Sequence, residues 1–241
     1  MKKDILDLLF DINQHGYEAY LVGGFVRDYI LGNGQNNDID IATNAPTSFL
    51  LELFKDYKPK CFKYETIKFK YNEYNIDIAH FRKEEFHDDS LSVLLVDNLF
   101  DDSFRRDFSI NSIYMDKNEF VYFFKSSYED RITQTIKFIK RIDDSLLEDP
   151  SRMLRYIYFI LKYNFKYVES EFEYISENGK RIIENVDQNI IQKYLNKISK
   201  ECNFELSIGI LKRLNIYTNL FGNLSTSGIN SWSEFLKQSN S

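Results

Sequence analysis

The sequence predicts an α+β fold, in which a mixed α/β head is followed by an all-helical second part. Short stretches with strand character alternate with helical patterns in the first part of the chain. From about Asp144 onward, apolar residues recur at helical spacing, beginning with Met153 and Leu154. A chain of 241 residues is long enough for two small domains with separate cores. We therefore divide it into residues 1–138 and 139–241.

The helices of the head are predicted from apolar periodicity. Apolar residues recur at helical spacing from Ile5 to Ile12, which indicates an amphipathic first helix that ends near Gly16. Two further helices are expected in the head, at residues 24–31 and 106–115.

The strands of the head are predicted from short apolar or alternating runs. In chain order these runs are residues 20–22, 38–42, 61–70, 74–81 and 120–124. A turn near Asn72 and Glu73 joins the third run to the fourth. Together these strands predict a sheet flanked by helices.

The composition argues against several classes of protein. No run of about 18 apolar residues is present, so no membrane span and no membrane partner are expected. The first residues lack the apolar core and cleavage site of a signal peptide. Cys61 and Cys202 lie far apart and without metal-type spacing, which is typical of reduced cysteines. We therefore expect a cytoplasmic location.

The net charge of −6 is unevenly distributed. Residues 1–138 hold 17 Lys and Arg against 24 Asp and Glu, a net of −7, whereas residues 139–241 hold 14 against 13, a net of +1. An acidic head suits a site built from metal and carboxylates. Contact with RNA would need local basic patches, which a summed charge does not reveal.

Three aspartates are candidates for a metal site. Asp38 and Asp40 alternate with isoleucines and share one face of a strand, and Asp77 lies in a similar stretch on a later strand. If these strands are neighbours, the three carboxylates converge, and divalent cations relieve their repulsion. Carboxylate oxygens favour Mg²⁺, with Mn²⁺ also possible, over zinc. The alternative is ordinary strand alternation with a solvated outer face.

Paired glycines precede the first two aspartates. Gly23 and Gly24 lie where a strand meets the start of a helix, and free N–H groups there make a seat for phosphate. Arg27 follows one turn later, where it would add a charged contact to a triphosphate. Alone, such a turn is usually only a tight connection. Followed by Asp38 and Asp40, it becomes a specific pattern.

The string from Leu21 to Pro46, LVGGFVRDYILGNGQNNDIDIATNAP, resembles motif A of the class II tRNA nucleotidyltransferases and bacterial poly(A) polymerases. The resemblance implies a nucleotidyltransferase-type (polymerase beta-like) head with a mixed sheet, followed by a helical neck and a body with a shortened C-terminal region. It also implies that Asp38 and Asp40 hold catalytic metal ions. Asp77, in the string IDIAHFR, matches the family's third carboxylate.

A second motif begins at Arg105. The string RRDFSIN is similar to the family's RRDFTxNA motif. By this resemblance Arg106 contacts the phosphates of the nucleotide, while Asp107 and Asn111 lie near the ribose, where polar groups distinguish the 2′-hydroxyl. The alternative is a helix start, with Asp107 stabilised by the helix dipole.

A third motif, EDPSRMLR from Glu148 to Arg155, resembles the family's EDxxRMxR and implies that Asp149, Arg152 and Arg155 bind nucleotide. On a helix, Asp149 and Arg152 would present their side chains together. An aspartate accepts hydrogen bonds from the amino group of cytosine or adenine, and an arginine donates to their bare ring nitrogens. Uracil and guanine present the opposite pattern. The alternative is that Asp149 caps a helix whose first residue is Pro150.

By this resemblance the chain adds C and A to the 3′ end of tRNA, or of another RNA, from CTP and ATP with release of pyrophosphate. Poly(A) synthesis and partial addition, of CC or of A alone, remain alternatives within the family. Transfer to a small molecule or protein is disfavoured by the third motif, and a non-enzymatic binding module by the presence of all three candidate metal ligands. No DNA partner is expected, and the sequence does not predict an oligomeric state.

Overall fold

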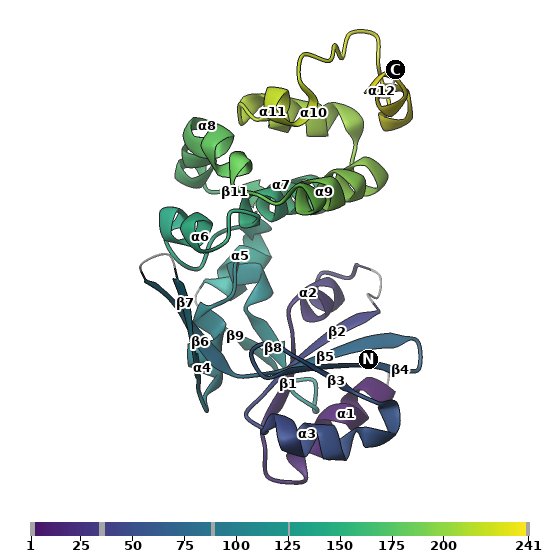
Figure 1. Ribbon diagram of the computed structural model, residues 1–241, viewed down its shortest axis with the longest axis vertical. Coiled ribbons are helices and arrows are strands. Elements are labelled where there is room, and N and C mark those ends of the chain that lie inside the picture. The colour runs from purple at the N-terminus through teal and green to yellow at the C-terminus, as the bar shows by residue number, and fades with distance from the viewer. Residues whose placement is uncertain (1–2, 34–36, 88–89, 125, 240–241) are drawn as a thin grey trace. The chain divides into compact units, whose positions relative to one another are not determined.

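The computed structural model describes residues 3–33, 37–87, 90–124 and 126–239. The described chain forms two compact units, Met1–Arg131 and Ile132–Ser241, whereas the sequence pattern placed the division between residues 138 and 139 (Figure 1). Residues 34–36 of the first motif lie outside the described residues.

The first unit is built on a seven-stranded sheet with the order β3-β4-β5-β2-β1-β8-β9. The strands are β1 (Ala19–Val22), β2 (Asp38–Thr43), β3 (Lys60–Phe62), β4 (Thr66–Tyr71), β5 (Tyr74–His80), β8 (Ile113–Met115) and β9 (Val121–Phe123). β2 and β5 pair in parallel, and the other neighbours pair antiparallel. The predicted mixed sheet is therefore confirmed.

Helices cover both faces of this sheet. α1 (Lys3–Asn13) and α3 (Thr47–Leu53) lie on one side, and α2 (Gly24–Ile30) lies on the other (Figure 1). α1 buries the apolar residues that predicted it. The unit also contains α4 (Leu99–Phe104), two single turns of 3-10 helix (Lys55–Tyr57 and Ser109–Asn111) and α5 (Ser127–Thr133), which runs into the second unit.

The predicted helix over residues 106–115 is wrong. That segment forms the 3-10 turn Ser109–Asn111 and then strand β8, which lies between β1 and β9. Its apolar residues are fully buried in the sheet, so tertiary packing decides their conformation. In addition, the Asp107 carboxylate accepts a hydrogen bond from the Phe108 N–H at 2.8 Å, a local bond that competes with helix formation.

Other parts of the first unit also differ from the prediction, and helices α3, α4 and α5 were not predicted. The run expected as one strand over residues 61–70 is two antiparallel strands, β3 and β4, separated by a turn in which Tyr64 and Glu65 have positive φ angles. A hairpin of β6 (Arg82–His87) and β7 (Ser90–Leu95) follows β5 and was not predicted. In the turn between β3 and β4, Tyr64 and Glu65 are neither glycine nor asparagine, the residue types that usually indicate such a turn, so the sequence did not predict it.

The second unit is helical, as predicted. Its helices are α6 (Ile142–Glu148), α7 (Arg152–Tyr163), α8 (Glu169–Glu184), α9 (Gln188–Glu201), α10 (Phe204–Arg213), α11 (Tyr217–Phe221) and α12 (Trp232–Ser239). A short parallel pairing of β10 (Thr135–Ile136) with β11 (Lys166–Tyr167) is added to them. Over the ranges that the structure describes, no helix has both the length and the apolar character needed to cross a bilayer.

Candidate functional site

The candidate metal ligands lie on two adjacent strands. β2 and β5 pair so that Asp40 lies opposite Asp77 and Asp38 lies opposite Asn75. Register partners on neighbouring strands share a face of the sheet, and so do residues i and i+2 of one strand. The three aspartates therefore lie on one face, and the expectation that their strands are neighbours is confirmed.

Two of these carboxylates have polar partners on the same face. Asp38 accepts a hydrogen bond from the Asn75 side-chain amide at 2.8 Å. Asp77 forms an ion pair with Lys68, its register partner on β4. Sequence reasoning missed Lys68, which becomes visible only once β4 is paired with β5.

The Asp40 carboxylate has a raised pKa. Burial raises its pKa, the Arg106 guanidinium opposes this rise, and the neighbouring Asp77 carboxylate adds to it. A negative charge that is partly withdrawn from water and placed beside another carboxylate is stabilised by a cation.

The donor set fits Mg²⁺. Mg²⁺ is usually held by one or two protein carboxylates together with substrate phosphates and water, rather than by a complete cage of side chains. Within the described residues, however, no three Asp, Glu, His or Cys side chains are placed so that they could hold a metal ion together, so the three aspartates share a face of the sheet without converging as predicted. Asp40 and Asp77, opposite each other and supplying only oxygen atoms, match the smaller requirement.

Gly23 places the glycine turn directly against these carboxylates. It precedes α2 with φ of 74°, a conformation that favours glycine. A Cβ atom at Gly23 would lie 3.1 Å from the Asp40 Oδ2 atom, a very close approach. Gly24 then begins α2, a helix of seven residues. The turn and the carboxylates, separate motifs in the sequence, thus form one site.

Arg27 belongs to a buried network with two other predicted nucleotide-binding residues. It donates to the Asn111 Oδ1 atom at 2.7 Å and to the Asp28 Oδ1 atom at 2.9 Å. Asn111 in turn donates to the Asp107 Oδ1 atom at 2.9 Å. The network fixes the position of the Arg27 guanidinium and joins the first motif to the second.

Arg106 is held by a residue that sequence reasoning missed. Asp102, which is fully buried, accepts from Arg105 at 2.7 Å, from Arg106 at 3.0 Å and from the Tyr114 hydroxyl at 2.7 Å. Burial alone would raise the pKa of Asp102, but the two guanidiniums and the hydroxyl hold it well below its usual value. The spacing of an aspartate three and four residues before the arginines was the available signal.

In the second unit, Asp149 makes local contacts. Its carboxylate accepts from the Ser151 backbone N–H at 2.9 Å and from the Ser151 hydroxyl at 2.6 Å. This is a turn between α6 and α7 and not the helix cap that was the alternative interpretation, because α7 begins at Arg152 and not at Pro150. The Arg155 guanidinium lies 3.6 Å from the Asp149 carboxylate.

Arg152 is buried and held from α6. Its guanidinium donates to the Glu148 carboxylate and to the Ser145 hydroxyl, both at 2.9 Å. The structure also brings the Arg155 guanidinium to the Asp149 carboxylate. Glu148 also pairs with Lys140, so Arg152 belongs to a charged cluster on α6 and its flank.

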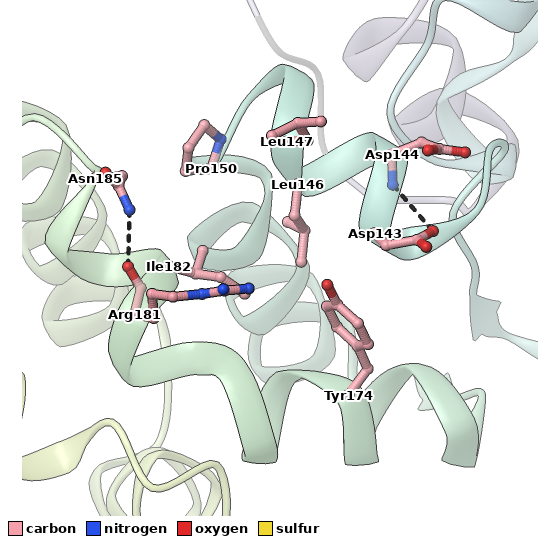
Figure 2. A pocket seen from close by; sticks show the side chains of 9 residues that line it. All are labelled: Asp143, Asp144, Leu146, Leu147, Pro150, Tyr174, Arg181, Ile182 and Asn185. Carbon is pink, nitrogen blue, oxygen red and sulfur yellow. Dashed lines mark hydrogen bonds between the residues drawn. The ribbon is translucent and has the colours of Figure 1, made fainter. Parts of the chain in front are cut away.

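A hollow of about 600 Å³ lies between α6 and α8 (Figure 2). Its lining residues are Asp143, Asp144, Leu146, Leu147, Pro150, Tyr174, Arg181, Ile182 and Asn185. Neither Asp149 nor Arg152 belongs to this lining, although Pro150 lies between them in the chain. The hollow is thus distinct from the predicted base-reading pair.

Comparison with known proteins gives one consistent result. Residues 19–136 match the poly A polymerase head domain. A CCA-adding enzyme of Staphylococcus aureus (strain MRSA252) is 30% identical over 229 residues, which cover 92% of this chain and 56% of that enzyme. The chain thus spans about half the length of the curated relatives it matches.

Solved structures agree with this match. The crystal structure of the Bacillus stearothermophilus CCA-adding enzyme in complex with CTP has a TM-score of 0.76 and 25% identity, covering 92% of this chain and 55% of that one. The Thermotoga maritima CCA-adding enzyme complexed with tRNA has a TM-score of 0.73 and 25% identity, covering 93% and 53%.

Proposed function

Because this chain belongs to the family that shares the poly A polymerase head domain and includes the CCA-adding enzymes, we propose that it adds C and A to the 3′ end of tRNA. CTP and ATP are the donors, and pyrophosphate is released. No template is required, because the protein selects the nucleotide. The reaction takes place in the cytoplasm, where tRNA is matured and used.

The observation that carries this proposal is the pairing of Asp40 with Asp77 beside the Gly23 turn. Two carboxylates lie on one face of the sheet, next to a glycine turn whose backbone a triphosphate can approach closely. This arrangement suits the transfer of a nucleotide from its triphosphate. Mg²⁺ bound there would be held by Asp40 and Asp77, with Asp38 beside them on the same face of the sheet, and would supply Lewis acidity toward the triphosphate and the attacking hydroxyl.

The remaining residues of the head hold the donor nucleotide. Gly23 and Gly24 let the backbone approach the triphosphate, and Arg106 neutralises phosphate charge. Arg27 adds a charged contact to the triphosphate, and its hydrogen bond to Asn111 joins it to the residues proposed to lie at the ribose, Asn111 and Asp107. Rigid positioning of such groups lowers the barrier, because little reorganisation is then needed during reaction.

Selection of the base and contact with RNA are assigned to residues 139–241. Asp149 accepts from an exocyclic amino group, and Arg152 donates to a ring nitrogen. The bonds of Arg152 to Glu148 and Ser145 orient its guanidinium, and Arg155 stands against the Asp149 carboxylate. This arrangement supports acceptance of C and A and rejection of U and G.

The test is incubation with tRNA transcripts that end before, within and after CCA, with each nucleoside triphosphate supplied separately. We expect C to be added to the first, the missing nucleotides to the second and nothing to the third. Extension of the finished end with A alone would assign the chain to poly(A) synthesis. Addition that always stops after CC, or that begins only there, would assign it to partial addition.

A further inference from the structure

Four cations gather on one side of the helix pair α7 and α9. They are Arg155 and Lys162 on α7 and Lys193 and Lys197 on α9, and we call them the α7–α9 patch. The Lys197 ammonium lies 5.5 Å from the centroid of the Tyr158 ring, and the Lys162 ammonium lies 5.4 Å from the same centroid. Cations from two helices thus meet over one aromatic ring.

The rings beneath the patch are buried. Tyr158 is 5% exposed and Tyr194 is 8% exposed, and their centroids lie 6.1 Å apart. Arg155 donates to the Tyr194 hydroxyl at 3.1 Å, and Lys197 also lies over the Tyr194 ring. Because the rings are covered, they orient cations through cation–π contacts and offer no face on which a base can stack.

Two carboxylates lie against the α7–α9 patch. Glu201 accepts from Lys162 at 2.8 Å and from the Tyr158 hydroxyl at 2.7 Å, and Asp149 lies 3.6 Å from Arg155. Burial lowers the pKa of Lys197, and the neighbouring cations lower it further against the opposing effect of Glu201. An anion near Lys197 would therefore relieve repulsion that the protein itself leaves in place.

We propose that the α7–α9 patch binds the phosphate backbone of an RNA stem and reads no sequence. Lys193 and Lys197 are one helical turn apart, about 6 Å along the axis, which is close to the spacing of adjacent phosphates on one strand. Buried rings and flexible ammonium groups suit charge contacts rather than base contacts. The inference rests on the proposed function and locates the stem-binding surface within the second unit.

The test measures binding of a labelled RNA hairpin by fluorescence anisotropy across a salt series, without nucleoside triphosphates. We expect K193Q/K197Q to weaken binding about tenfold and to reduce the logarithmic salt slope by about 1.5, because each phosphate contact contributes about 0.7 to 0.9. Lys193 is exposed, so K193Q alone should keep the fold and give about half of the slope change.

The matched control is K180Q/K237Q, which removes two exposed lysines from α8 and α12 of the same unit. It should leave affinity within about twofold, since charge at a distance is screened. Hairpins of unrelated sequence should lose affinity equally. An equal loss in both double variants, or a loss confined to single-stranded RNA or to one sequence, would overturn the proposal. So would an unchanged affinity for RNA with weakened binding of polyglutamate, which would point to an acidic protein partner.

Nucleotide addition tests the proposed function, and hairpin binding tests the α7–α9 patch, so the two proposals can fail separately. Addition to a short single-stranded primer ending in CC does not need a stem, so K193Q/K197Q should keep wild-type turnover on it. If the wild-type protein adds no nucleotide, the proposed function is wrong, yet the binding measurement still decides the role of the patch. If it adds nucleotides but both double variants bind the hairpin like wild type, only the patch is wrongly assigned.

Discussion

Asp40 and Asp77 lie directly opposite each other on the parallel strands β2 and β5. Neighbouring strands are about 5 Å apart, so the two carboxylates share one small region of the sheet face. The Gly23 turn lies directly against one of them, the Asp40 carboxylate. Two adjacent negative charges in such a place favour a divalent cation.

We expect D40N and D77N each to lower nucleotide addition by about a thousandfold or more, because the neutral amide binds Mg²⁺ poorly. Folding should be kept or slightly improved, since one of two repelling charges is removed. D56N is the matched control in the same unit, and its turnover should equal that of the wild type. Steady-state rates with and without EDTA, beside thermal melting, check this. Turnover within tenfold of wild type would remove the mutated residue from the mechanism.

Lys68 should compete with a divalent ion for Asp77. Its ammonium pairs with that carboxylate, so K68M should let the protein bind Mn²⁺ about twofold to fivefold more tightly, a gain typical of removing one partly exposed charge pair. K70M is the control, because Lys70 lies opposite Asn75 rather than a carboxylate. Electron paramagnetic resonance of free Mn²⁺ measures the affinity without relying on turnover. Weaker Mn²⁺ binding in K68M would show that the lysine supports the site.

Local patterns in the sequence predicted part of the head correctly and missed α3, α4 and the β6–β7 hairpin. The alternation around Asp38 and Asp40 predicted β2, and the apolar spacing between Ile5 and Ile12 predicted α1, because both signals depend on residues that are close in the chain. The helix over residues 106–115 was wrong, since burial of Tyr114 between two strands outweighs its local pattern. Such pairing depends on distant segments.

In the candidate site, too, local sequence patterns identified some residues, whereas others depend on segments that are distant in the chain. Motif strings named Arg27, Asp107 and Asn111, but the hydrogen bonds that join them cross from one segment to another that is distant in the sequence. Lys68 and Asp102 carry no motif of their own. Lys68 gains a role only from strand register, and Asp102 only from complete burial beneath two arginines. Register and burial are properties of the folded chain.

Asp102 should be a major source of stability for the head. D102N leaves the Arg105 and Arg106 guanidiniums without their buried counter-charge, so the free energy of unfolding should fall by about 3 to 5 kcal/mol. Y114F is the milder comparison and should cost about 2 kcal/mol, because it removes two hydrogen bonds, one donated to Asp102 and one accepted from Arg106, but no charge. Urea denaturation at neutral pH measures both.

The difference in the free energy of unfolding between the wild type and D102N should depend on pH. The pKa of Asp102 is lowered in the folded protein, so its stabilising effect is complete above the ordinary aspartate pKa of about 4 and declines as the pH falls below it. The gap between wild type and D102N should therefore be constant from about pH 5 to 8 and should narrow at lower pH. A gap that widened on acidification would contradict the ionised state of Asp102.

Asp149 should decide which nucleotides are used. The wild-type protein should incorporate CTP and ATP and reject UTP and GTP, because a carboxylate accepts from an amino group and repels a carbonyl oxygen. D149N keeps an oxygen that can accept from the Ser151 N–H, so the turn between α6 and α7 should be preserved. Its new amide N–H group, however, faces the base as a donor.

We therefore expect D149N to lose about a hundredfold in kcat/KM for CTP and ATP, and to lose much less, or to gain, for UTP and GTP. S151A removes only a hydroxyl that donates to Asp149, and it should keep the wild-type preference at somewhat reduced stability. Competition assays with all four nucleotides give the ratios directly, and thermal melting separates a change in selection from a loss of fold. If D149N retains the wild-type ratios while S151A alters them, the carboxylate serves only the turn, and the base is read by other residues.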